Sequence, residues 1–169
     1  KNIRKEYLYR IKKNFYKLIN HEKKFVNSLT AFKDIDAQEW QDVMQINLNG
    51  MVFMTQALIP ALEKAESASV IFTTSSVGRK GRAFWGTYAV SKFATEGVMQ
   101  TLADEYRNKS LRFNCINPGG TRTQMRAQAF PAENPDTLKT PEDIMPTYLY
   151  LMGEDSKETT GQSLDCQPK

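Results

Sequence analysis

The sequence predicts an α/β fold in which a parallel sheet carries helices on both faces, giving three layers. Helix-like and strand-like segments alternate along residues 35–169, in the order helix, strand, helix, strand, helix, strand. Such alternation is typical of βαβ crossovers, whose parallel sheet is covered on both sides. The chain has 169 residues, of which 40% are hydrophobic and 25% charged, so it can bury the core of one domain.

The first predicted helix begins after Asp36 and continues to about Lys64. The segment DAQE (residues 36–39) matches a capping box, with an N-cap acceptor followed by a glutamate at the third helical position. Trp40, Val43 and the apolar residues that follow recur at three- and four-residue spacing, which indicates one buried helix face. A proline at position 60 is expected to kink this helix.

The remaining elements follow from the same two signals. Short apolar runs rich in β-branched and aromatic residues predict strands, whereas apolar faces at helical spacing predict helices. Proline at the first helical position marks one more helix start. In chain order we expect a strand at Val70–Thr74, a helix at about Tyr88–Arg107, a strand at Leu111–Ile116, a helix from Pro141 to near Gly153 and a strand at Gly161–Cys166.

The clearest chemical signal is a tyrosine and a lysine one helical turn apart, in the segment YAVSK (residues 88–92). Side chains at positions i and i+4 share a helix face, so the Lys92 ammonium is expected near the Tyr88 phenol. A free tyrosine has a pKa of about 10, which a neighbouring cation lowers. Ser75 lies thirteen positions before Tyr88 and could bind the same substrate oxygen. This trio predicts proton transfer to or from a carbonyl.

A second candidate site element is the turn at Pro118–Thr123, which follows a predicted strand. Ligands of open parallel sheets bind at the carboxyl ends of the strands. Ser75 also follows a predicted strand directly. We therefore expect the serine and the turn to converge in one crevice.

Five motifs in a fixed order make residues 35–166 similar to the short-chain dehydrogenase/reductase family. They are Asn47 in QINLNG (45–50), Ser75 in TSSVG (74–78), the Y-x-x-x-K pair Tyr88 and Lys92, PGGTRT (118–123), and GQSL (161–164). Each is common alone, but five in order, with the family's usual spacing from Ser75 to Tyr88, are a specific signal. The resemblance implies a Rossmann-like sheet that is N-terminally truncated here.

The resemblance also implies an activity, NAD(P)-dependent hydride transfer between nicotinamide and a carbonyl or secondary alcohol. Tyr88 would be the general acid or base, and Lys92 would lower its pKa and bind the nicotinamide ribose. Ser75 would orient the substrate oxygen, with Ser76 as the alternative serine. Asn47 would hold a water in a proton relay that ends at Lys92.

The coenzyme and partner expectations rest on the same resemblance. The nicotinamide would lie against Tyr88, Lys92, Pro118, Gly119, Thr121 and Thr123. The segment at about residues 124–138 would be a mobile specificity lid, and the helices near residues 40–60 and 88–107 would make a homo-oligomer. No metal site is expected, and the substrate would be a small carbonyl or alcohol.

The family's glycine-rich pyrophosphate turn is missing, because no glycine precedes Gly50. That turn lets the backbone approach the pyrophosphate at a helix N-terminus. Without it the choice between NAD and NADP stays open. It also leaves an alternative function open: a truncated, inactive fragment or an interaction module that cannot bind the coenzyme, with one strand edge exposed.

Residues 1–34 differ in composition from residues 35–169, and we treat them as a separate, atypical segment. They contain ten Lys or Arg against three Asp or Glu, and they include His21, the one histidine. Apolar residues from Ile3 to Leu18 would line one face of a basic helix. Binding of this segment to nucleic acid or a membrane is a third, weaker hypothesis. A different reading is that it is translated AT-rich DNA, placed there by a frameshift or deletion.

Two cysteines without metal or disulfide spacing, no secretory signal and no long apolar stretch favour a cytoplasmic setting.

Overall fold

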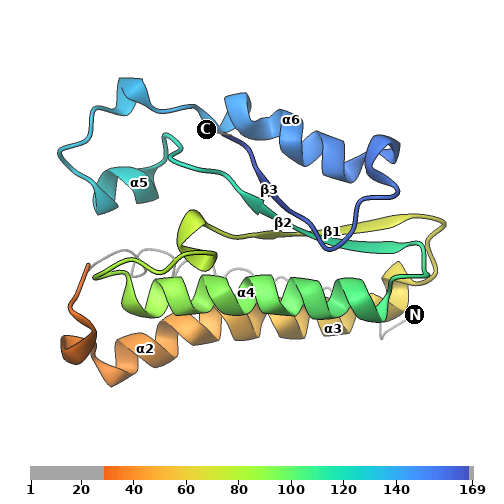
Figure 1. The fold of residues 1–169 in the computed structure, drawn as a ribbon, viewed down its shortest axis with the longest axis horizontal. Coiled ribbons are helices and arrows are strands. Elements are labelled where there is room, and N and C mark those ends of the chain that lie inside the picture. The colour runs from red at the N-terminus through yellow and green to blue at the C-terminus, as the bar shows by residue number, and fades with distance from the viewer. Residues whose placement is uncertain (1–28, 168–169) are drawn as a thin grey trace, which may run out of the picture.

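The computed structural model of the chain describes residues 29–167 and contains a parallel three-stranded sheet between helical layers (Figure 1). The strands are β1 (Ala68–Thr73), β2 (Leu111–Asn117) and β3 (Ser163–Asp165), and they lie in the order β1-β2-β3. In the register, residue 72 of β1 is opposite residue 115 of β2, which is opposite residue 163 of β3. The predicted α/β class and the parallel sheet are confirmed.

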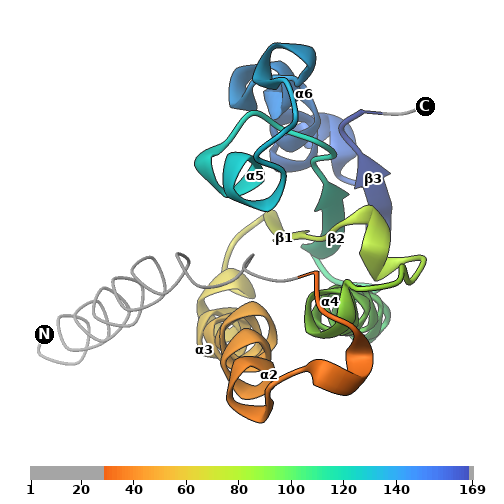
Figure 2. The same cartoon turned by 90° about the vertical axis from the view of Figure 1, so that its left-hand side faces the viewer.

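Helices cover both faces of this sheet. One face carries α3 (Met51–Leu62) and α4 (Gly86–Glu105), with α2 (Ala37–Met44) preceding α3 along the same axis (Figures 1 and 2). The other face carries α6 (Pro141–Met152), and the short helix α5 (Gln124–Ala129) lies beyond the carboxyl end of β2. The three predicted layers are therefore present.

The core lies between the sheet and α4. Phe72 of β1 and Phe113 of β2 stack with their ring centroids 6.4 Å apart, and Met99 of α4 is 1% exposed beside them. Every residue of β2 from Leu111 to Ile116 is buried, as expected for the central strand. The thiol of Cys115 belongs to this core, and burial, together with Glu96, raises its pKa to about 12.

Side chains cap two helix starts, and the Asp36 acceptor is the one that the sequence predicts. The Asp36 carboxylate accepts hydrogen bonds from the backbone N–H groups of residues 38 and 39, at 2.9 and 3.0 Å. At α6 the Thr140 hydroxyl and the Asp143 carboxylate bond each other's backbone N–H groups, which completes a capping box. These contacts lower the pKa of the Asp143 carboxyl, and the largest cause is the hydrogen bond from the backbone N–H of Thr140.

The long first helix differs from the expectation. The sequence predicts one helix with a kink at Pro60, whereas the structure has a π-helical segment, Gln45–Gly50, between α2 and α3. Pro60 lies inside α3. A π segment widens the helix by one residue per turn and is often found at functional sites. Asn47, a predicted site residue, lies within it.

The segment at residues 124–138 was expected to be a mobile specificity lid. It contains α5 and a 3-10 turn, Pro135–Thr137. Arg126 also makes a two-pronged ion pair with Glu133, with N···O distances of 2.6 and 2.7 Å. This contact closes the segment on itself.

Residues 1–28 lie outside the described part of the chain. The predicted basic helix, His21 and the proposed nucleic-acid or membrane contact all fall there. Of the atypical segment, residues 29–34 are described, and the N–H of Thr30 donates to the carbonyl of Phe84 at 3.0 Å.

The packing of the loop after β1 generates a stability prediction. A Cβ at Gly78 would lie 2.8 Å from Thr74 Oγ1 and 2.9 Å from the carbonyl carbon of Lys92. Since a backbone atom cannot move aside cheaply, Gly78→Ala should lower the free energy of unfolding by about 1–3 kcal/mol. Urea denaturation followed by circular dichroism measures this. Gly81→Ala is the matched control, because nothing lies within 4 Å of its Cβ. Equal midpoints for both variants would contradict the prediction.

Candidate active site

The fold brings Ser75, Tyr88 and Lys92 to the carboxyl end of β1. Ser75 follows this strand and caps the 3-10 turn Ser76–Gly78, with Val77 N 3.5 Å from its hydroxyl. Tyr88 and Lys92 come from the first turns of α4, which starts at Gly86. The missing side chain of Gly78 lets the serine loop pack directly on the backbone of Lys92.

Lys92 ties its helix to the end of the strand. Its Nζ donates a hydrogen bond to the carbonyl oxygen of Thr73 at 3.0 Å. The same Nζ lies 5.6 Å from the centroid of the Tyr88 ring. The two side chains therefore share a face of α4, as their spacing predicts.

The electrostatics of the tyrosine differ from the expectation. Burial raises the pKa of Tyr88 above its ordinary value, and hydrogen bonding by the Ser75 side chain opposes that rise. Lys92 is not among the causes of this shift, and burial lowers the pKa of Lys92 itself. The expected lowering of the phenol pKa by the ammonium is thus not seen in this structure. Of the two adjacent serines, Ser75 is the one whose side chain lowers the Tyr88 pKa, and its catalytic role stays a prediction.

Asn47 reaches α4 from the π segment. Its Nδ2 donates to the Ser91 hydroxyl at 3.2 Å, and that hydroxyl donates to the carbonyl of Tyr88 at 2.7 Å. Asn47 is therefore linked to the helix that carries the tyrosine and the lysine. Its role in a water-mediated relay stays a prediction.

The turn after β2 lies beside this group of residues, as the sequence predicts. Gly119 has a φ of 73°, the left-handed region that favours glycine. Thr121 is buried and its backbone bridges to Lys139, while the Thr123 hydroxyl caps α5 by accepting from Arg126 N at 3.1 Å. The cap leaves the proton of that hydroxyl free to donate to a ligand.

Aromatic residues that the sequence reasoning missed flank the tyrosine. The Trp85 ring lies 5.8 Å from the Tyr88 ring and 6.1 Å from Phe130 of the segment after α5, measured between centroids. The guanidinium of Arg126 lies 3.9 Å from the Phe130 ring centroid. The spacing of Trp85 and Tyr88, three residues apart at a helix start, was a usable signal for this contact. Phe130 had no such local signal.

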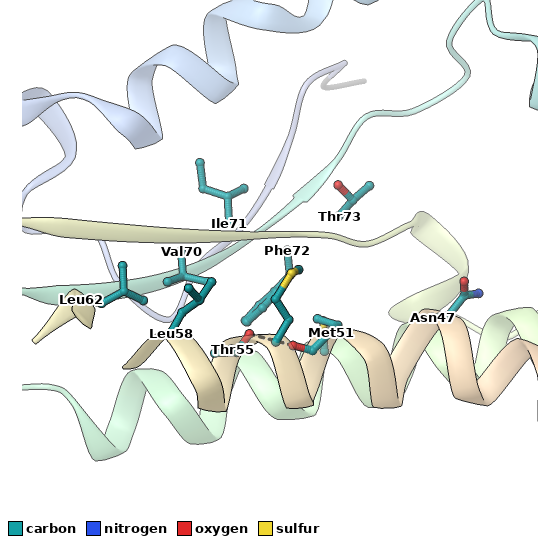
Figure 3. Close-up of a pocket in the computed structure, with 10 residues that line it drawn as sticks. Asn47, Met51, Thr55, Leu58, Leu62, Val70, Ile71, Phe72 and Thr73 are labelled. Atoms are coloured by element: carbon teal, nitrogen blue, oxygen red, sulfur yellow. Dashed lines mark hydrogen bonds between the residues drawn. The ribbon is translucent and has the colours of Figure 1, made fainter. Parts of the chain in front are cut away.

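An apolar groove of about 260 Å³ runs from Asn47 and Thr73 along α3 to Leu62 (Figure 3). Val70 and Phe72 of β1 face α3 across it, whereas Ile71 points to the opposite side of the sheet. Within residues 29–167, β1 pairs only with β2, so its other edge borders this groove. This is the exposed strand edge that the sequence predicts.

Two further observations apply to residues 29–167 only. No cluster of His, Cys, Asp and Glu side chains there has the arrangement of a metal site. No helix in the same range has the length and apolar character needed to span a bilayer.

Fold and site together define a Rossmann-like α/β protein with a Ser–Tyr–Lys group at the carboxyl end of its sheet. The sequence model of the short chain dehydrogenase family matches residues 25–134. The chain belongs to this family.

Individual relatives agree with that assignment. The uncharacterized oxidoreductase YciK of Escherichia coli K12 is 56% identical over 161 residues, covering 94% of this chain and 64% of the relative. A short-chain dehydrogenase of Salmonella enterica serovar Typhi CT18 has 62% sequence identity and a TM-score of 0.83, covering 85% of this chain and 59% of that one. One from Escherichia coli CFT073, solved in complex with NADPH, has 60% identity and a TM-score of 0.82 over the same shares. The chain thus spans about 60% of the length of these relatives.

The site generates a prediction about the two adjacent serines. Because the Ser75 hydroxyl lowers the pKa of Tyr88, Ser75→Ala should raise that pKa further. The titration can be followed by NMR of tyrosine labelled with ¹³C at Cζ, with Tyr88→Phe to assign the signal. Ser76→Ala is the control and should leave the Tyr88 pKa unchanged. A larger rise of the Tyr88 pKa in Ser76→Ala than in Ser75→Ala would show that Ser76 is the serine that lowers this pKa.

Proposed function

We propose that this chain carries the catalytic half of an NAD(P)-dependent oxidoreductase, which reduces a carbonyl or oxidises a secondary alcohol with Tyr88 as general acid or base. The observation that carries the proposal is the joint placement of Ser75, Tyr88 and Lys92 at the carboxyl end of β1. A serine hydroxyl and a tyrosine phenol beside a lysine ammonium are suited to binding and protonating a carbonyl oxygen.

The nicotinamide half of a coenzyme fits the residues present. The Lys92 ammonium and the Thr123 hydroxyl can donate to a ribose and a carboxamide. When bound, the nicotinamide supplies or takes the hydride. NADPH is the coenzyme to test first, because the Escherichia coli CFT073 relative was solved with it.

In the reductive direction Ser75 would hold the substrate oxygen and Tyr88 would give its proton to that oxygen. The raised pKa of Tyr88 means that the phenol carries this proton throughout the neutral range. This state suits the general acid that carbonyl reduction requires. Lys92 would stabilise the phenolate left behind, and Asn47 would support the relay that restores the proton.

An alternative function is a fragment or interaction module without coenzyme binding. The apolar groove favours it, because it lies beside the edge of β1 that has no partner strand within residues 29–167, and such edges pair readily with another strand. A titration of the chain with NADPH separates the two functions. Quenching of the reduced-nicotinamide fluorescence at micromolar NADPH supports the oxidoreductase, and its absence supports the alternative.

The central test of the oxidoreductase is Tyr88→Phe. Removing the acidic proton should lower turnover by about 10²–10⁴-fold while the affinity for NADPH changes little. Turnover is measured from NADPH absorbance with a panel of small carbonyl compounds. Tyr106→Phe, near the far end of α4, is the matched control and should keep full activity. A Tyr88→Phe variant with unchanged turnover would remove this tyrosine from the mechanism.

We further propose that the chain forms a homo-oligomer through α3 and α4. These helices lie side by side and expose large apolar side chains, and the exposed fractions are 59% for Phe53 and 45% for Phe93 (Figure 1). Surface of this kind usually marks an interface.

A charged residue in that surface should separate the subunits. Phe53→Glu and Phe93→Glu are each expected to lower the mass measured by light scattering toward that of one chain, because a carboxylate is costly to bury. Met152→Glu is the control, since Met152 is 65% exposed on α6, across the sheet. If the unaltered chain is already a monomer, the proposal is wrong.

A further inference from the structure

The residues that end and follow β3 contact both parts of the proposed site. The Asp165 carboxylate pairs with Arg79, which follows the serine loop, and accepts from Asn117 Nδ2 at 2.6 Å. The backbone N–H of Cys166 donates to the carbonyl of Asn117 at 3.0 Å. The chain therefore leaves the sheet directly alongside the turn that starts at Pro118.

Gln167 makes the next contact, and it uses one nitrogen for two bonds. Its Nε2 donates to the carbonyl oxygens of Pro118 and Gly120, each at 2.9 Å. A primary amide nitrogen has two protons, so both are used by the turn. The two acceptors lie on either side of Gly119, and the side chain thus spans the turn.

The glycine between those carbonyls accommodates the amide. A Cβ on Gly119 would lie 3.0 Å from Gln167 Nε2 and 3.2 Å from its Cδ. Gly119 also has a positive φ. The turn is outside any regular helix or strand, so its carbonyls depend on partners such as this side chain.

We propose that Gln167 is a positioning residue for the nicotinamide-binding turn. By holding the carbonyls on both sides of Gly119, it fixes the turn before a ligand arrives. A turn that is already ordered costs less conformational entropy when it binds than one that must be ordered on contact. The inference rests on the proposed function, because it assigns nicotinamide as the ligand of the turn.

The test compares Gln167→Glu with the unaltered chain. Glutamate has nearly the same shape, but its carboxylate has no proton to donate at neutral pH and would face two carbonyl oxygens. Gln162→Glu is the matched control, because it adds the same charge on an exposed side chain shortly before β3. Gln167→Ala, which removes the bonds without adding repulsion, is the second variant in case the first fails to fold.

Two measurements are made on each variant. Hydrogen exchange of the Gly119 amide, which donates to Asn117 Oδ1 within the turn, should accelerate about tenfold to a hundredfold in both Gln167 variants, the loss expected for two net hydrogen bonds that hold the turn. The affinity for reduced nicotinamide mononucleotide, measured by saturation-transfer NMR, should fall by a similar factor while the thermal midpoint of unfolding stays near that of the Gln162→Glu control.

The outcomes separate the inference from the function. Unchanged exchange in the Gln167 variants overturns the inference, and so does faster exchange with unchanged nicotinamide affinity. No binding of reduced nicotinamide mononucleotide to the unaltered chain overturns the proposed function, and the inference with it. The inference is supported if both Gln167 variants lose amide protection and nicotinamide affinity while Gln162→Glu keeps both.

Discussion

The hydrogen bond from Lys92 Nζ to the carbonyl oxygen of Thr73 determines the geometry of the proposed site. It fixes the start of α4 against the end of β1, and so it sets where Tyr88 lies relative to Ser75. It also gives a partner to an ammonium whose pKa is lowered by burial. Because Gly78 packs on the backbone of the same lysine, the serine loop cannot shift without moving the helix.

Much of this arrangement could be predicted from the sequence, because its signals are local. The i, i+4 spacing placed Tyr88 and Lys92 on one face, and the alternation of elements gave the parallel sheet and thus the shared end of the strands. The same reasoning could not predict the pKa of Tyr88, which depends on how deeply a packed chain buries the ring. Nor could it find Phe130, whose contact with Trp85 joins residues 45 positions apart in the chain.

The site is held from several independent directions. Asn47 reaches it from the helix before the sheet, and Gln167 from the segment after the last strand. Each contact joins elements distant in sequence, so no single loop defines the proposed site. Side chains held in this way are preorganised, which is what transition-state stabilisation requires.

The π segment Gln45–Gly50 has a consequence for how the length of this helix can vary. Each π turn holds about one residue more than an α turn, so loss of a single residue there would restore regular α geometry while α2 and α3 kept nearly the same rotation about their common axis. The change would be local: side chains of the segment, Asn47 among them, would shift around the axis, and the bond from Asn47 to Ser91 would be lost. A single-residue deletion in this stretch should therefore preserve the packing of both helices and disturb the site alone.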